Sequence, residues 1–283
     1  MILVPWITDE LHKETFRMNR DEFFDSLWRQ YISVTPQARG IQSLLLRRGE
    51  EVTNDHVAFR TFDIQGFGLE IVTELVAEIG YERFDSYVFP DKHLRAHAYW
   101  VPNEHDVPKI FFSELVCAEL DSDSQSIIAE ITSPLTGELT LKDLVGAYLF
   151  KRPTLEQYSR LCDASEYAGW LSTMGYQANH FTVNVNGLRT LDSIDGLIDL
   201  LVANQYPLNN VGGVIKGTTS DLLVQASTLA DTIRFEFEDG FESDIPSCFY
   251  EFAYRFTDST GQPFQGFIPN SANAIFESTD RQA

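Results

Sequence analysis

Residues 54–62 read Asn-Asp-His-Val-Ala-Phe-Arg-Thr-Phe, and residues 178–186 read Ala-Asn-His-Phe-Thr-Val-Asn-Val-Asn. Both stretches are rich in β-forming residues and alternate in character, which predicts two β-strands. Each strand opens on a histidine that follows an Asp or Asn. The two stretches therefore suggest that one structural unit occurs twice in the chain.

The segments that follow each histidine strand support this repeat. A helical pattern comes next in both halves, at 67–80 and at 192–204. Three strand-like pieces then follow each helix, at 82–89, 93–101 and 109–118, and at 221–227, 232–238 and 248–256. The interval between the two histidines is far longer than the roughly 20–50 residues of a solenoid repeat. We therefore expect two tandem β-α-β-β-β modules in an α+β fold.

The remaining segments are expected to flank or connect these modules in a single domain. Helical patterns occupy residues 1–50, with one helix from about 21 and a second beginning at Pro36 and ending near Gly49. The first module takes 51–120 and the second 176–260. Between them, 121–175 should open with a polar linker at 121–124 and continue as a helical connector, with helices at 141–150, 155–161 and 167–171. The tail, 261–283, is expected to wrap the surface.

Alternation along the strands predicts a polar cavity. His56 and Arg60 share one face of the first strand, and His180 has the matching place on the repeat strand. Glu251 lies opposite an aromatic face on the last strong strand, with Glu114 as its expected counterpart in the first module. If the modules pair about a pseudo-twofold axis, the two imidazoles and one carboxylate form a facial triad. Such a triad suits Fe(II) and oxygen chemistry, and Zn(II) or Mn(II) less specifically.

Simpler interpretations stay open at this point. Each histidine could be a hydrogen-bonded structural residue, and a buried Glu251 could pair with Arg255 or Arg60. Arg60 could instead form a structural ion pair with Glu114 or Glu251. A rival metal cluster is conceivable in a turn-rich segment that carries His93, His97 and His105.

Composition excludes several classes of function. Asp and Glu number 42 against 21 Lys and Arg, a net charge of −21, and there is no basic stripe, so nucleic-acid binding is not expected. The three cysteines are widely spaced and contain no C-x-x-C, which favours a reducing cytoplasm. Residues 1–9 do not read as a signal peptide, and no stretch is apolar enough to suggest a membrane partner.

Taken together, the motifs resemble a family long labelled as a domain of unknown function, some members of which are 2-oxoadipate dioxygenase/decarboxylases, also called 2-hydroxyglutarate synthases. The resemblance runs in order from about residue 20 to 270 and rests on TNDHVAFRTF (53–62), HAYW (97–100), KIFFSEL (109–115), NHFT (179–182), LVQASTLAD (223–231) and YEFA (250–253). It implies a fold like the vicinal-oxygen-chelate fold, with modules that form a curved sheet around a metal cavity.

The resemblance also implies roles for individual residues. His56, His180 and Glu251 match the family's metal ligands, and Arg60 matches its substrate-binding arginine. Gln225 and Ser227 share one face of their strand and could add hydrogen bonds to substrate, although pairing within the core would explain them equally.

The implied chemistry uses Fe(II), a 2-oxo acid and O2, and turns 2-oxoadipate into 2-hydroxyglutarate and CO2. Arg60 lies ~13 Å along the strand from His56, a distance suited to the far carboxylate of a diacid. Two alternatives remain: a metal-dependent hydrolase or isomerase on the same scaffold, and a non-catalytic protein that binds a small molecule. The sequence does not indicate an oligomeric state.

Overall fold

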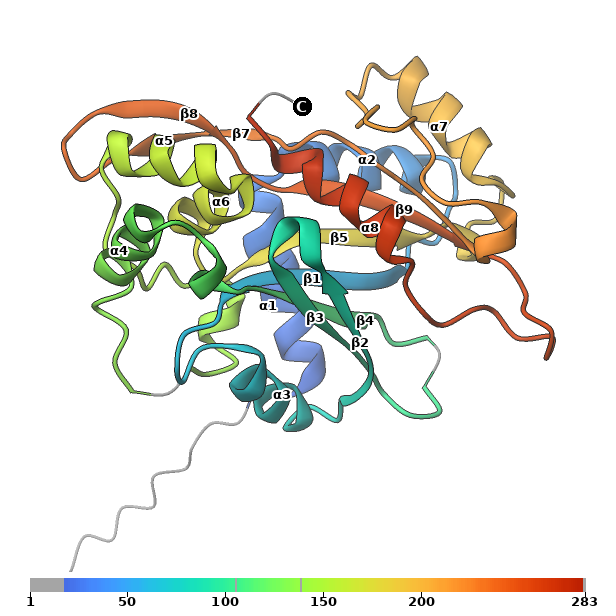
Figure 1. Ribbon diagram of the computed structural model, residues 1–283. Helices are drawn as coiled ribbons and strands as arrows, with labels where there is room; N and C mark the ends of the chain where they lie inside the picture. Colours follow the sequence, from blue (N-terminus) through green and yellow to red (C-terminus); the bar gives the residue numbers. More distant parts are fainter. Residues whose placement is uncertain (1–17, 105, 138, 282–283) are drawn as a thin grey trace, which may run out of the picture.

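The computed structural model describes residues 18–104, 106–137 and 139–281 and has an α+β architecture (Figure 1). The expectations for residues 1–17 and for His105 fall outside these ranges. The helices are α1 (Arg20–Val34), α2 (Pro36–Arg47), α3 (Leu69–Ala77), α4 (Ser122–Ile131), α5 (Leu155–Ala164), α6 (Glu166–Met174), α7 (Ile194–Ala203) and α8 (Pro269–Phe276). The strands are β1 (Asn54–Phe62), β2 (Glu82–Phe89), β3 (Leu94–Trp100), β4 (Lys109–Leu115), β5 (Ala178–Asn184), β6 (Leu223–Ser227), β7 (Thr232–Glu236), β8 (Glu242–Pro246) and β9 (Phe249–Arg255).

One seven-stranded sheet, in the order β2-β3-β4-β1-β5-β9-β6, unites the two repeats. The histidine strands β1 and β5 run antiparallel at its centre, with Val57 opposite Phe181. On the outer side of each, the last strand of the same repeat runs parallel to it: β4 beside β1, and β9 beside β5. This arrangement has an approximate twofold axis between the central strands, so the predicted pairing of the repeats is confirmed.

The second repeat departs from the expected pattern in one strand. β7 does not join the main sheet but pairs with β8 in a separate two-stranded hairpin. Thr232, Arg234 and Glu236 alternate along β7 and are exposed, so this strand has only one face that can be buried. Isolated bridges from Leu208 and Lys216 to the segment around β6 occupy part of the place that the missing strand would have taken.

The sheet is curled, and α8 spans its open side. This helix contacts both edge strands, β2 and β6, and lies across the sheet in Figure 1. Helix α1 covers the opposite face, where Trp28 packs edge-on against Phe181 with ring centroids 5.1 Å apart. The aromatic face predicted for the last strand meets this helix through Tyr250. The space over the other face of the sheet is therefore enclosed between the central strands and α8.

Two expectations for the connector are wrong. Asp121 is not in a linker: its side chain caps α4 by accepting hydrogen bonds from the amides of Asp123 and Ser124. Residues 141–150 do not form a helix. They contain a single 3-10 turn at Asp143–Val145, which ends where Gly146 adopts a φ of +97°. The helices predicted at 155–161 and 167–171 are present as α5 and α6.

The tail does not merely wrap the surface, as the sequence suggested. Pro269 begins α8, and the helix places Ile275 and Phe276 in the interior, 3% and 8% exposed. The apolar residues of this helix extend over only two turns, and the Gly and Pro residues of the segment obscured the helical pattern in the sequence. The tail therefore forms one wall of the enclosed space.

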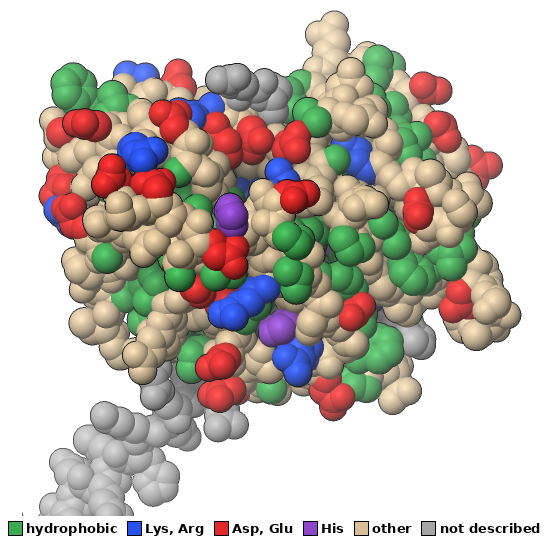
Figure 2. All heavy atoms as spheres, in the orientation of Figure 1, with side chains coloured by type: hydrophobic (Ala, Val, Ile, Leu, Met, Phe, Trp, Pro, Cys, Tyr) green, Lys and Arg blue, Asp and Glu red, His purple; other side chains and the backbone are tan. Residues whose placement is uncertain are grey.

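The acidic composition is visible on the surface. Figure 2 shows Asp and Glu side chains scattered over one face of the molecule, with Lys and Arg side chains between them. Among the described helices, none combines the length and the apolarity that crossing a bilayer requires.

Glu114 is not the counterpart of Glu251. Glu251 lies opposite Thr182 on the neighbouring parallel strand, and the equivalent place in the first repeat, opposite Ala58, belongs to Phe111. Glu114 is buried beneath α3, where it accepts a hydrogen bond from the amide of Leu69 at 2.7 Å and pairs with Arg95. Its carboxylate therefore anchors the start of that helix.

We predict that Glu114→Ala lowers the free energy of unfolding by about 1–3 kcal/mol, because the Leu69 amide loses its buried acceptor. Arg95 adds little to this cost because its side chain is 54% exposed. Urea denaturation measures the change, with Glu119→Ala as an exposed control that should stay within about 0.5 kcal/mol of the parent. A folded Glu114→Ala protein that had lost the ability to bind metal would contradict this assignment.

Candidate metal centre

Two β-bulges in the central strands set the positions of the histidines. Asn54 and His56 face consecutive residues of β5, so Asp55 is the extra residue of a bulge. Ala178 and His180 likewise face consecutive residues of β1, which makes Asn179 the extra residue of a second bulge. Bulges redirect side chains. Here each bulge brings an Asp or Asn beside the imidazole that follows it.

These neighbours fix the orientation of both rings. Asp55 Oδ1 lies 2.7 Å from His56 Nδ1, and Asn179 Oδ1 lies 2.9 Å from His180 Nδ1. When each Nδ1 carries the proton and donates it to that oxygen, each Nε2 presents a lone pair. Both imidazoles are thus prepared as ligands on their Nε2 side.

Glu251 completes the cluster from β9. Its Oε1 is 3.6 Å from His56 Nε2, and its Oε2 is 3.2 Å from His180 Nε2. One ligand atom from each of the three residues lies within 4.8 Å of the others. The predicted meeting of two imidazoles and one carboxylate is therefore confirmed as geometry, and the three atoms could hold one metal ion.

The alternative ion pairs for Glu251 are absent from the described residues. Arg255 instead pairs with Asp55, at 2.6 Å between Nε and Oδ2. Burial alone would raise the pKa of Asp55, but the Arg255 charge and hydrogen bond hold it well below its usual range. Asp55 is consequently an anion that supports His56, and Arg255 is committed to that anion.

The surroundings of Glu251 disfavour its negative charge, and a bound cation would stabilise that charge. The side chain is fully buried, and burial raises its pKa to about 8. Gln225 donates a hydrogen bond to Oε1 at 2.5 Å, whereas Oε2 has no hydrogen-bond partner. Burial also lowers the pKa of His56 and His180, which keeps both rings neutral. An orphaned carboxylate oxygen beside two neutral imidazoles fits a divalent metal ion.

The other predicted residues have different positions. Gln225 holds Glu251 and borders the cluster. Ser227 is buried against Ser278, with its Oγ 2.9 Å from that of Ser278, and does not border the cluster. In the rival group, His93 contacts Glu119 and His97 contacts Ser86. Within the described part of the chain, these two histidines do not belong to a cluster of metal-binding groups.

Apolar side chains close the space over the cluster. Phe111 and the residues of the C-terminal segment leave a cavity of only about 20 Å³ beside the three ligand atoms. The residues contributed by that segment are Phe267, Ala272, Ile275 and Phe276. Such a volume accommodates about one water molecule. The cluster is therefore shielded from bulk solvent.

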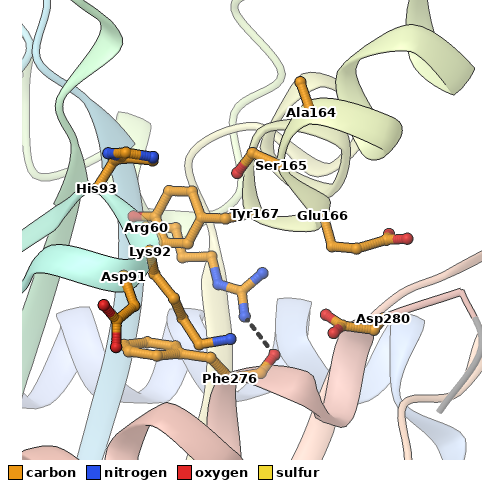
Figure 3. Close-up of a pocket in the computed structure, with 10 residues that line it drawn as sticks. All are labelled: Arg60, Asp91, Lys92, His93, Ala164, Ser165, Glu166, Tyr167, Phe276 and Asp280. Carbon is orange, nitrogen blue, oxygen red and sulfur yellow. Dashed lines mark hydrogen bonds between the residues drawn. The ribbon is translucent and has the colours of Figure 1, made fainter. Parts of the chain in front are cut away.

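Arg60 lies beyond this wall on the same face of the sheet, in a second cavity of about 210 Å³ (Figure 3). The side chain is 2% exposed, and its Cζ lies 4.8 Å from the ring centroid of Tyr167 and 4.9 Å from that of Trp170. Its one hydrogen bond goes to the carbonyl of Phe276 at 3.2 Å, and its buried Nε has no partner.

No described carboxylate approaches Arg60 within ion-pair distance, so the predicted alternative pairs with Glu114 or Glu251 are not formed. The Asp280 carboxylate borders the same cavity and attracts Arg60, but the two groups form no direct ion pair. A buried guanidinium without a direct ion pair is costly. Figure 3 shows its terminal nitrogens pointing into the cavity, toward the space that Lys92 also reaches. Arg60 is therefore available to an anionic ligand.

Sequence reasoning missed the residues that support and enclose the cluster. Alternation places Asp55 and Asn179 on the wrong face, because it assumes regular strands. A possible signal was the Asx-His pair that opens both strands. Phe267 and Phe276 were missed because the tail gave no strong periodic pattern.

Comparisons with known proteins identify relatives of this chain. The family model described as 2-oxoadipate dioxygenase/decarboxylase matches residues 30–139 and 136–262. The chloroplastic 2-oxoadipate dioxygenase/decarboxylase of Arabidopsis thaliana is 32% identical over 92% of this chain and 78% of its own length.

Two solved structures are similar to this chain in both fold and sequence. Hydroxyglutarate synthase from Oryza sativa, in complex with 2-oxoadipate, has a TM-score of 0.85 and 29% identity over 92% of this chain and 91% of its own. A protein from Shewanella frigidimarina, provisionally described as a hydrolase, has a TM-score of 0.82 and 34% identity over 89% of this chain and 99% of its own.

A more distant structure supports the expected fold. A Ralstonia eutropha protein provisionally assigned to the glyoxalase superfamily has a TM-score of 0.74 at 22% identity, covering 87% of this chain and 84% of its own. The prediction of a vicinal-oxygen-chelate-like fold is confirmed. The family model and the Arabidopsis relative, which is 32% identical, each match most of this chain. The chain therefore belongs to the 2-oxoadipate dioxygenase/decarboxylase family.

Proposed function

We propose that this chain is a metal-dependent dioxygenase/decarboxylase that converts 2-oxoadipate and O2 into 2-hydroxyglutarate and CO2. The observation that carries the proposal is a three-ligand cluster with one orphaned carboxylate oxygen, on the same sheet face as a buried arginine whose Nε has no hydrogen-bond partner. A 2-oxo diacid has a 2-oxo group that can bind at the cluster and a far carboxylate that can bind to Arg60. Membership of the family and the likeness to a 2-oxoadipate complex support this substrate.

His56, His180 and Glu251 are the proposed ligands, and Fe(II) is the proposed metal. Two neutral imidazoles and one carboxylate leave coordination positions for substrate and for O2, which favours iron, although Zn(II) or Mn(II) could occupy the same donors. When bound, Fe(II) would supply the activation of O2 and the oxidation of the 2-oxo acid.

The protein's own contribution is orientation and exclusion of water. Asp55 and Asn179 hold the two rings, and Gln225 holds one oxygen of Glu251 so that the other is available. The phenyl groups around the cluster keep water away from the reacting carbon.

Arg60 would bind the far carboxylate of the substrate. Its guanidinium can form two parallel hydrogen bonds to a carboxylate, and the aromatic rings of Tyr167 and Trp170 keep it in place. With the 2-oxo group at the cluster and the other end at Arg60, the diacid is fixed at both ends. The orientation of the carbon chain between them is then determined.

The proposed reaction balances without a further reductant. Cleavage of the bond between C1 and C2 releases C1 as CO2, and the five remaining carbons form 2-hydroxyglutarate. One oxygen atom of O2 completes the new carboxylate at the former keto carbon, and the other becomes the hydroxyl group. The oxidative decarboxylation supplies the electrons that the hydroxylation requires.

A second candidate is a metal-dependent hydrolase on the same scaffold, favoured by the provisional description of the Shewanella protein. The same three ligands could bind Zn(II) and activate a water molecule. Activity with zinc and without O2 would support this alternative.

We predict that Glu251→Gln abolishes stoichiometric metal binding, because the amide keeps the shape of the side chain but loses the anionic ligand. Metal analysis by mass spectrometry after loading with Fe(II), Zn(II) or Mn(II) measures the effect. Glu114→Gln is the matched control, since it neutralises another buried glutamate of the same sheet and should retain the metal. Equal metal content in both variants would refute the ligand assignment.

The activity itself is tested by oxygen consumption. Fe(II)-loaded protein should consume one O2 for each 2-oxoadipate and release equal amounts of CO2 and 2-hydroxyglutarate. An oxygen electrode combined with product analysis by mass spectrometry gives this stoichiometry. The dioxygenase proposal fails if no 2-oxo acid supports oxygen uptake by the metal-loaded protein.

Arg60→Met should lower kcat/KM for 2-oxoadipate by roughly 10–150-fold, because a hydrogen bond to a charged partner contributes about 1.5–3 kcal/mol. The comparison substrate is 2-oxohexanoate, which has the same chain length but no second carboxylate. Its kcat/KM should change much less. Equal losses with both substrates would assign Arg60 to structure rather than to recognition of the far carboxylate.

A further inference from the structure

Phe276 occupies a special place between the two cavities. One space borders His56, His180 and Glu251, and the other borders Arg60. Among the described residues that line them, Phe276 alone belongs to both. It therefore forms the partition between the ligand cluster and the arginine.

The ring and the backbone of this residue both contact the site. The ring centroid lies 5.8 Å from Cζ of Arg60, and the ring packs edge-on against Phe89 at 5.4 Å. The backbone carbonyl accepts the hydrogen bond from Arg60 Nη2 at 3.2 Å (Figure 3). That carbonyl oxygen thus occupies one of the positions on Arg60 that a carboxylate oxygen would take.

The available volume shows that the partition has to open. About 20 Å³ remains at the cluster, whereas pockets for small molecules usually have roughly 300–1,000 Å³. A six-carbon diacid that spans from the cluster to Arg60 must pass the position of the Phe276 ring. The ring and the substrate cannot both be there.

The main chain next to Phe276 is firmly held, which makes rotation of the ring the simpler movement. Ser278 accepts a hydrogen bond from the Ala230 amide at 2.9 Å, and its hydroxyl lies 2.9 Å from both Asn209 Nδ2 and Ser227 Oγ. Side chains exchange between staggered rotamers far more readily than such an anchored backbone shifts.

We propose that Phe276 is a gating residue: its ring keeps the path between cluster and arginine closed, and any 2-oxo acid long enough to reach Arg60 must displace it. This inference rests on the proposed function and adds the residue that controls access to Arg60. A diacid gains charge-assisted hydrogen bonds to Arg60 once the ring has turned away. A 2-oxo acid of the same length without the second carboxylate meets the same ring and gains no such bonds.

The test compares ligand binding to Fe(II)-loaded wild-type protein and Phe276→Ala by calorimetry without oxygen, so that binding is separated from turnover. Removing the ring should tighten the binding of 2-oxoadipate and of 2-oxohexanoate by about tenfold, the factor expected if the open arrangement is about a tenth of the population. Zn(II), titrated into the metal-free protein, does not cross the partition, and its dissociation constant should stay within about twofold. The Phe276 carbonyl remains in the variant, so the change reports the ring alone.

Phe237→Ala is the matched control, because Phe237 is equally enclosed but packs against Tyr158, away from both cavities. It should leave all three dissociation constants unchanged. If Phe276→Ala does not fold, Phe276→Leu should give a smaller change in the same direction. The proposed role of Phe276 is refuted if a folded variant binds both long ligands with the wild-type dissociation constants. If 2-oxoadipate binds to neither protein, the proposed function fails, and the partition fails with it.

Discussion

The fold buries the carboxyl group of Glu251 beside the imidazoles of His56 and His180. A carboxylate with one oxygen lacking any partner is expensive in an apolar interior, and its raised pKa records that cost. Nearby arginines could have relieved it, but Arg255 is bound to Asp55 and Arg60 lies beyond Phe276. The charge of the ionised Glu251 is therefore left for a metal ion to balance, rather than for an arginine of the protein.

The duplicated architecture explains how three ligands from distant parts of the chain come together. Antiparallel pairing of β1 and β5 places the two histidines on either side of an approximate twofold axis, and matching bulges bring an oxygen to each Nδ1. The symmetry is broken where function requires it. Glu251 in one repeat is matched by Phe111 in the other, so a single carboxylate lies on one side and a phenyl ring closes the opposite side.

Much of this could be predicted from sequence because it depends on short-range periodicity. Alternation located His56, His180 and Glu251 on the correct faces, and the repeated Asx-His start revealed the duplication. Properties that depend on long-range packing were missed. Neither the position of β7 in a separate hairpin nor the closure of the sheet by α8 follows from local pattern, and Glu114 looked equivalent to Glu251 until the strand register was known.

The central claim is that His56, His180 and Glu251 bind one metal ion. The most direct measurement is a crystal structure of the Fe(II)-loaded protein, with anomalous diffraction recorded on both sides of the iron absorption edge. We expect one strong anomalous peak within about 2.0–2.3 Å of both Nε2 atoms and of a Glu251 oxygen, by analogy with distances at comparable metal sites. A fully loaded crystal whose anomalous peak lies elsewhere, with these three side chains unliganded, would contradict it.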